Sequence, residues 1–165
     1  MIVLINGSIN SGKTTVGRHL AAMLPQTAHV EVDSLREFVA FLPLDDAIPI
    51  SLENAAAVAR NLARRGFHIV LTYPLGPEDH AYLRAQFADL DTPIHTITLS
   101  PPLAIALTDR GTRPLTDHER RRIREQYADN RHNPPFGITI DNSTQTPTQT
   151  ATTILRTLNL LPTSP

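Results

Sequence analysis

Ile5-Asn6-Gly7-Ser8-Ile9-Asn10-Ser11-Gly12-Lys13-Thr14-Thr15 is the most informative segment of this chain. It matches the pattern G-x-x-x-x-G-K-[ST] and stands between a short apolar run, residues 2–5, and a helical pattern that Pro25 ends. In such a segment the glycines let successive backbone N–H groups turn inward toward phosphate oxygens, and the following helix adds its positive end. The segment therefore predicts a phosphate-binding loop, or P-loop, between a strand and a helix.

Lys13 is the only lysine in the chain of 165 residues, which also carries fourteen arginines. A compact ammonium group fits the small centre of a P-loop and reaches the β- and γ-phosphates, whereas a broad guanidinium does not. Thr14 supplies a hydroxyl oxygen for Mg²⁺. The alternative is a glycine turn with a chance lysine, and the complete motif in its proper context argues against it. The residues expected to bind the nucleotide are Gly7, Ser8, Asn10, Ser11, Gly12, Lys13, Thr14 and Thr15.

The composition is that of an ordinary soluble domain, with 41% hydrophobic residues, 19% charged residues and a net charge of −1. This charge gives no general electrostatic reason for nucleic acid or an anionic membrane to be the main partner. The absence of cysteine excludes disulfides and thiolate chemistry. The apolar start is too short for a signal peptide, and no run approaches the roughly 20 apolar residues of a membrane helix. We therefore expect a cytoplasmic protein with no membrane partner.

Apolar and β-branched runs alternate with helical patterns along the chain. This order predicts an α/β three-layer sandwich, in which helices cover both faces of a five-stranded parallel sheet. Because there is no internal repeat and no second core pattern, we expect the whole chain, 1–165, to be one domain. The expected strands are residues 2–5, 28–32, 67–72, 94–99 and 138–140.

Capping residues predict where several helices begin. Ser51 is the candidate N-cap of a helix that Gly66 ends, and a further helix is expected over residues 34–42. Thr116 opens a polar helix with the spacing of a capping box, and Thr146 is expected to cap the last helix.

Two classes of P-loop protein are disfavoured by what the chain lacks. A GTPase needs an Asn-Lys-x-Asp motif for guanine, and no second lysine is present to build it. A motor or AAA-type ATPase usually has an acidic pair at the end of a hydrophobic strand, and the run Ile69–Tyr73 ends without an acid.

The sequence resembles the small P-loop kinases with a nucleoside-monophosphate-kinase-like fold. This group includes shikimate and gluconate kinases, chloramphenicol phosphotransferases and tunicamycin-resistance proteins. The resemblance rests on the P-loop, on Val30-Glu31-Val32-Asp33-Ser34-Leu35 and on Asp109-Arg110-Gly111-Thr112-Arg113. The second motif is most similar to the chloramphenicol phosphotransferase pattern. The resemblance implies a kinase that uses ATP and Mg²⁺ and phosphorylates a hydroxylated small molecule.

In kinases of this group an aspartate after the second strand faces the acceptor hydroxyl. The resemblance assigns that role to Asp33, which would accept the hydroxyl proton. An N-cap of the helix over 34–42 is the alternative role. Glu31 is two residues earlier on an extended strand and shares its face with Asp33. For Glu31, a role in holding a Mg²⁺-bound water and a structural role both remain open.

The arginine-rich segment resembles the lid of these kinases, within a lid region of about residues 109–132. Arg110 and Arg113 are the candidates for stabilising the transferred charge, and Arg110 also for binding the nucleotide. An exposed helix end is the alternative. The arginines at 120–124 point in different directions on a helix, so that a solvated face is expected there.

The acceptor region of the resembling kinases corresponds to about residues 34–65 here. Arg36, Phe38 and Tyr73 are the candidate acceptor contacts, with His80 as a weaker one. Ordinary core packing is the alternative for at least one of Phe38 and Phe41.

The sequence thus predicts an ATP-dependent kinase acting on a small-molecule hydroxyl. Two alternatives stay open: a nucleotide-binding regulatory protein that hydrolyses ATP slowly, and a kinase acting on nucleotides or RNA ends. The identity of the acceptor and the oligomeric state do not follow from the sequence.

Overall fold

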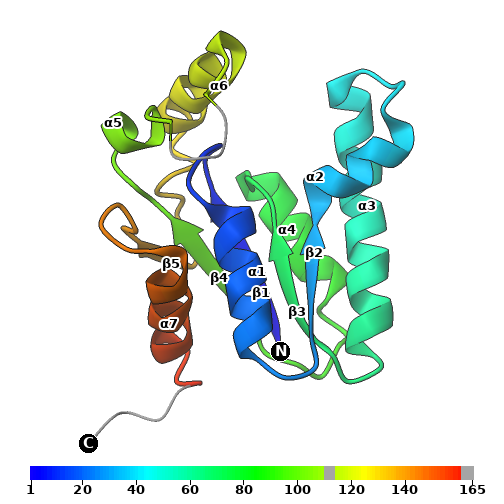
Figure 1. The fold of residues 1–165 in the computed structure, drawn as a ribbon. Coiled ribbons are helices and arrows are strands. Elements are labelled where there is room, and N and C mark those ends of the chain that lie inside the picture. Colours follow the sequence, from blue (N-terminus) through cyan, green and yellow to red (C-terminus); the bar gives the residue numbers. More distant parts are fainter. Residues whose placement is uncertain (110–113, 161–165) are drawn as a thin grey trace, which may run out of the picture.

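The computed structural model describes residues 1–109 and 114–160, which form a five-stranded parallel sheet with helices on both faces (Figure 1). The strand order is β2-β3-β1-β4-β5. This confirms the predicted α/β three-layer sandwich, and each expected strand is present. The elements are β1 (Ile2–Gly7), α1 (Lys13–Met23), β2 (Thr27–Glu31), α2 (Val32–Leu35), the 3-10 helix η1 (Arg36–Val39), α3 (Leu44–Ala63), β3 (His68–Thr72), α4 (Pro77–Gln86), β4 (Ile94–Leu99), α5 (Leu103–Ala106), α6 (Asp117–Ala128), β5 (Ile138–Ile140) and α7 (Pro147–Thr157).

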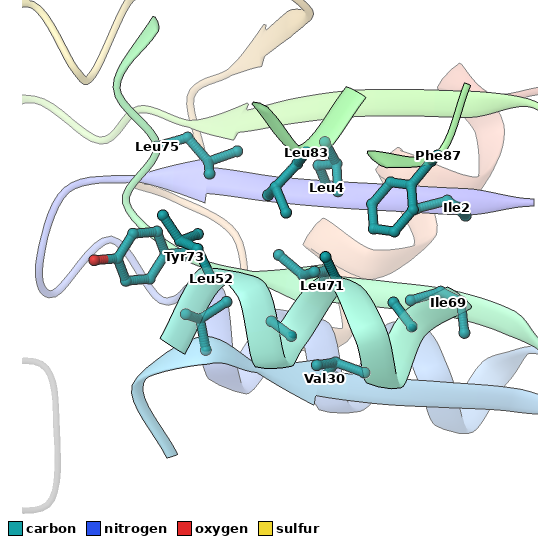
Figure 2. Close-up of a cluster of buried hydrophobic side chains, with 14 residues drawn as sticks. Ile2, Leu4, Val30, Leu52, Ile69, Leu71, Tyr73, Leu75, Leu83 and Phe87 are labelled. Atoms are coloured by element: carbon teal, nitrogen blue, oxygen red, sulfur yellow. The ribbon is translucent and has the colours of Figure 1, made fainter. Parts of the chain in front are cut away.

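The central strand β1 is buried on both sides, and alternate side chains enter two separate cores. Ile2 and Leu4 pack with α3 and α4, where Phe87 is the largest fully buried side chain (Figure 2). Val3 and Ile5 pack with α1 and α7 on the opposite face. A strand buried on both faces has no polar alternation, which is why residues 2–5 form a continuous apolar run.

The sheet topology brings the loops after the strands together at one edge. Strand β1 lies between β3 and β4, and the chain leaves β1 for β2 on one side of the sheet and later continues to β5 on the other. In open parallel sheets, ligands bind at the carboxyl ends of the strands near such a change of direction. Figure 1 shows α6 on one side of this edge and the corner between α2 and α3 on the other.

Helix α3 begins at Leu44, so the prediction that Ser51 is its N-cap is wrong. Pro49 lies inside the helix, where it leaves only the carbonyl of the exposed residue Asp45 without its helical donor. Ser51 is buried, and its hydroxyl donates to the carbonyl of Ala47 at 2.8 Å. Thr116 and Thr146 do cap α6 and α7, each with a capping box.

The region after β2 also differs from the prediction. Strand β2 ends at Glu31, and two short pieces, α2 and η1, replace the single helix expected over 34–42. Glu31 and Asp33 therefore do not share one strand face, because the chain turns into α2 between them.

Candidate active site

The P-loop follows β1 and ends where α1 begins. Gly7 has a φ of 142°, and a Cβ at this position would lie 2.5 Å from the carbonyl oxygen of Leu99. Gly12 has a φ of 93° and occupies the N-cap position of α1. Both glycines of the motif thus have backbone conformations that other residues rarely adopt, and Gly7 also leaves no room for a side chain.

Lys13 points back into the loop that precedes it. Its Nζ donates to the carbonyl oxygen of Ser8 at 2.7 Å, and the residue is only 9% exposed. Burial lowers the pKa of Lys13 to about 8, while the negative charges of Asp33 and Glu31 oppose this shift. The ammonium group is therefore held at the centre of the loop, where phosphate oxygens would replace part of its lost hydration.

Thr14, in the first turn of α1, donates a hydrogen bond of 2.5 Å to Oε1 of Glu31 at the end of β2. The other carboxylate oxygen of Glu31 contacts Arg18 at 3.3 Å and the hydroxyl of Ser34 at 3.4 Å. The structure thus brings Thr14 and Glu31 together. A hydroxyl and a carboxylate oxygen are hard ligands of the kind that Mg²⁺ prefers.

Asp33 lies in the first turn of α2, whose N-cap is Glu31, so the alternative of an N-cap role for Asp33 is wrong. The residue is solvent exposed, yet it lines a cavity, and surrounding protein atoms partly desolvate its carboxylate. This desolvation raises the pKa of Asp33, and the nearby charges of Lys13 and Arg36 oppose the change. Asp33 thus lies close enough to Lys13 for their charges to interact while it also faces a separate space.

That space is a cavity of about 390 Å³, here called the acceptor cavity. Arg36 and Tyr73, two of the predicted acceptor contacts, line it. Burial raises the pKa of Tyr73 to about 12, so its hydroxyl stays protonated, and Figure 2 shows that hydroxyl pointing away from the core. The lining residues are Ile9, Asp33, Arg36, Leu44, Ile48, Tyr73, Pro74, His118, Glu119, Arg122 and Gln126.

The structure places Phe38 and His80, the two other candidate acceptor contacts, outside the acceptor cavity. Phe38 is 74% exposed and Phe41 is 82% exposed, so the alternative that one of them packs in the core is wrong. Their positions in η1 and in the turn after it, away from the sheet, account for this exposure. His80 stacks on Phe136 with ring centroids 3.9 Å apart, and its Nε2 lies 3.0 Å from the hydroxyl of Thr96, which indicates a structural role.

Helix α6 contributes acceptor-cavity residues that sequence reasoning missed. His118, Glu119, Arg122 and Gln126 occur at helical spacing along the side of α6 that carries the fully buried Ile123. Arg122 also forms an ion pair with Glu125 at 2.9 Å. The spacing of these four residues already placed them on one side of a helix. The many charged residues around them, however, favoured the interpretation of α6 as a solvated face.

A second cavity, of about 230 Å³, lies beside the P-loop on the side of α7. Asn142 and Gln145 line it together with Gly12 and Thr15. The amide of Asn142 donates to the carbonyl of Ser11 at 2.9 Å. The Asn142 Oδ1 and Gln145 Oε1 atoms are buried and have no hydrogen-bond partner among residues 1–109 and 114–160. Sequence reasoning missed both residues, although each follows β5 at the carboxyl edge of the sheet. Two residues that line the cavity thus carry a buried oxygen without a hydrogen-bond partner among the residues that the structure describes.

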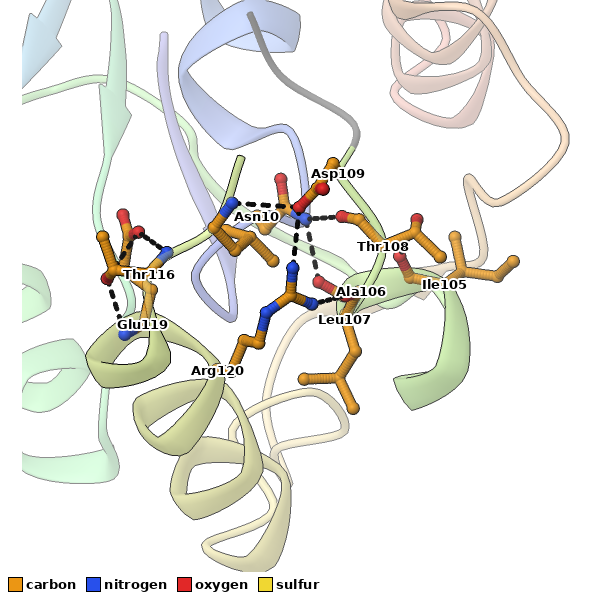
Figure 3. A network of polar contacts seen from close by, with 10 residues as sticks. Asn10, Ile105, Ala106, Leu107, Thr108, Asp109, Thr116, Glu119 and Arg120 are labelled. Carbon is orange, nitrogen blue, oxygen red and sulfur yellow. Dashed lines mark hydrogen bonds and ion pairs between the residues drawn. The ribbon is translucent and has the colours of Figure 1, made fainter. Parts of the chain in front are cut away.

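The predicted lid residues Arg110 and Arg113 lie outside the described residues. On either side of them, Oδ1 of Asp109 accepts hydrogen bonds of 2.9 Å from the backbone N–H of Leu115 and from Arg120 (Figure 3). The amide of Asn10, at the tip of the P-loop, donates to the carbonyls of Ala106 and Thr108, each at 2.8 Å. The P-loop is therefore hydrogen-bonded to the segment just before the predicted lid region.

A larger hollow of about 560 Å³ lies between α3 and α4, away from the strand ends. Arg60 and Arg64, which line it, both contact Asp89 and so are already paired. In the described part of the chain, no group of three or more His, Asp or Glu side chains is arranged to hold a metal, and no helix has the length and apolar character needed to cross a membrane.

Solved structures share this fold over nearly the whole chain. A tunicamycin resistance protein from Deinococcus radiodurans is 21% identical, with a TM-score of 0.69 over 99% of this chain and 98% of that one. The Mycobacterium tuberculosis APS kinase, in complex with AMPPNP and APS, is 22% identical, with a TM-score of 0.68 over 96% of each chain. A shikimate kinase from Acinetobacter baumannii, in complex with shikimate, is 21% identical, with a TM-score of 0.65 over 96% of this chain and 92% of that one. No protein-family model and no curated protein matches the sequence. The chain therefore has the fold of the P-loop kinases of the shikimate kinase-like group.

Proposed function

We propose that this protein is a kinase that transfers the γ-phosphate of ATP to a hydroxyl group of a small molecule. One observation carries the proposal: Asp33 lies within electrostatic reach of the P-loop lysine and also lines the acceptor cavity together with Ile9 of the loop. A carboxylate in that position stands between a phosphate-binding loop and a space of substrate size. The kinase neighbours in the structural comparison support the same reaction class.

The nucleotide would lie across the P-loop with its base in the smaller cavity. The backbone N–H groups of the loop and Lys13 would hold the phosphates. The unpartnered oxygens of Asn142 and Gln145 suit the exocyclic amino group of adenine, which donates where guanine presents a carbonyl. This arrangement favours ATP over GTP.

Mg²⁺ fits the same site, because the Thr14 hydroxyl and the Glu31 carboxylate are adjacent. These two side chains would hold the ion directly or through water, and the nucleotide phosphates would complete its shell. When bound, the ion would neutralise charge on the phosphates.

In the transfer, Asp33 would accept the proton of the acceptor hydroxyl. The hydroxyl oxygen would bond to the γ-phosphorus as the bond between the γ-phosphorus and ADP breaks. Tyr73 and Arg36 would orient the acceptor from the wall of the cavity. Arg110 and Arg113 are proposed to stabilise charge on the transferred group.

The test is Asp33→Asn, with Asp91→Asn as a matched control. Asp91 is an exposed aspartate before β4, at the opposite edge of the sheet. ATP consumption would be measured across a panel of hydroxylated metabolites and antibiotics, with mass spectrometry of the product. We expect Asp33→Asn to lower transfer by about 10²-fold or more at unchanged ATP affinity. Normal turnover by Asp33→Asn would refute the assignment of Asp33.

A regulatory protein that binds ATP without a small acceptor is the second candidate. The exposure of Phe38 and Phe41 favours it, because large exposed aromatic side chains are typical of a protein contact. Such a protein would hydrolyse ATP at a rate that no member of the panel changes.

A further inference from the structure

The backbone N–H of Ile9, near the tip of the P-loop, donates to Oε1 of Gln126 at 2.7 Å. Gln126 is only 4% exposed, and α6 holds it in place through the fully buried Ile123. A polar side chain from the lid region is thus fixed against the phosphate-binding loop, 117 residues away in the sequence.

This bond determines the orientation of the Gln126 carboxamide. Because Ile9 supplies an N–H, the atom that faces it must be the carboxamide oxygen. The Nε2 amino group then points away from the loop, and it has no hydrogen bond within residues 1–109 and 114–160. Gln126 and Ile9 both line the acceptor cavity, whereas Gly12, Lys13 and Thr14 do not. The free donor is therefore on the acceptor side of the P-loop rather than among its phosphate ligands.

We propose that Gln126 determines acceptor specificity, its Nε2 donating a hydrogen bond to an oxygen of the acceptor while its Oε1 stays bonded to Ile9. The inference rests on the proposed kinase function. It assigns the acceptor a hydrogen-bond-accepting oxygen in addition to the hydroxyl whose proton Asp33 receives. Gln126 and Ile9 line the same cavity, so the Gln126 side chain contacts the P-loop through Oε1 and faces the acceptor through Nε2.

Two substitutions separate the two ends of the carboxamide. Gln126→Glu keeps an oxygen for Ile9 and removes the amino group, whereas Gln126→Met has a similar size and removes both. Arg124→Ala is the control, because Arg124 is an exposed residue of α6 that does not line the cavity. Each variant would be compared with the unchanged protein for its melting temperature, for AMPPNP affinity by titration calorimetry, and for KM and kcat with the acceptor that the panel identifies.

We expect both Gln126 variants to raise the acceptor KM by about tenfold or more, the effect of a lost specific hydrogen bond. AMPPNP affinity should fall in both variants, in Gln126→Glu because the new carboxylate repels the phosphates and in Gln126→Met because the Ile9 amide loses its partner. Arg124→Ala should change neither quantity. An unchanged acceptor KM in Gln126→Met overturns the inference, because that variant removes Nε2 without adding a charge; a weakened AMPPNP affinity beside it would limit Gln126 to supporting the P-loop. If the unchanged protein phosphorylates no acceptor, the proposed function fails, and the inference fails with it.

Discussion

Thr14 Oγ1 and Glu31 Oε1 lie 2.5 Å apart, so that a hydroxyl at the start of α1 donates to a carboxylate at the end of β2. Arg18 and Ser34 contact the other oxygen of the same carboxylate. These partners limit rotation of the Glu31 side chain and keep it beside the P-loop. The hydrogen bond from Thr14 thus holds Glu31 against the P-loop, whereas Asp33, two residues later, already belongs to α2.

This pair predicts an effect of Glu31→Gln on magnesium dependence. The substitution keeps the shape of the side chain but removes the charge that would attract the ion. Losing such a partner typically weakens metal affinity by about 10–100-fold. We therefore expect the Mg²⁺ concentration for half-maximal ATP use to rise by at least about tenfold. Glu37→Gln, a change at an exposed carboxylate in η1, is the control and should leave the magnesium dependence unchanged.

The buried Lys13 predicts that ATP binding takes up a proton at alkaline pH. Burial lowers the pKa of Lys13 to about 8, so above that pH the ammonium group of the free protein is largely neutral. Bound phosphate favours the charged form, which raises the pKa, and binding must then protonate the lysine. The apparent ATP affinity should therefore fall as pH rises above about 8, by at most about tenfold per pH unit, and Lys13 should contribute no pH dependence below about pH 7.

Calorimetric titration with ATP at pH 7 and pH 9, in buffers of different ionisation enthalpy, measures this uptake. If the unchanged protein takes up no proton at pH 9, Lys13 does not titrate as described.

The unpartnered oxygens of Asn142 and Gln145 predict selection of adenine. Gln145→Leu removes one of these acceptors while roughly keeping the size of the side chain. We expect the ratio of kcat/KM for ATP to that for GTP to fall by about tenfold, the usual effect of one lost hydrogen bond in a specific site. Thr144→Ala, at an exposed neighbouring position, should keep the ratio. Equal ratios in Gln145→Leu and the unchanged protein would show that the base lies elsewhere.

The sequence predicted the sheet well because its signals are local. The runs that became β1 and β3 contain contiguous apolar residues, and the run that became β4 is rich in β-branched residues, which are local signals of a buried strand. The start of α3 was harder to predict, because Pro49 is a helix breaker by local rules and is tolerated only near an exposed helix start. The division of residues 32–39 into α2 and η1 has no local signal that we can identify.

The candidate site likewise contains some residues that a local motif predicts and others that depend on distant contacts. The P-loop was predictable because its chemistry lies in one contiguous motif that requires glycine at two positions. Gln126, Asn142 and Gln145 were missed because each acquires its role from a contact more than 100 residues away in the sequence or from a cavity closed by several elements. A lone glutamine or asparagine in a polar segment gives no sign of such a partner.

Asn6 predicts that the P-loop depends on a buried polar network for stability. This fully buried residue precedes Gly7; its Oδ1 accepts from the backbone N–H of Leu75 at 2.7 Å, and its Nδ2 donates to the hydroxyl of Thr98 at 3.1 Å. The side chain thus joins the ends of β1 and β4 to the loop after β3.

Asn6→Leu has a similar volume but leaves a buried N–H and a buried hydroxyl without partners. Each such group costs about 1–3 kcal/mol, so we expect the free energy of unfolding to fall by about 2–6 kcal/mol. Urea unfolding measures the change, with Asn61→Leu on the exposed side of α3 as the control. A loss below about 0.5 kcal/mol, the range of ordinary surface substitutions, would mean that water replaces the amide of Asn6 and that the network does not hold the loop in place.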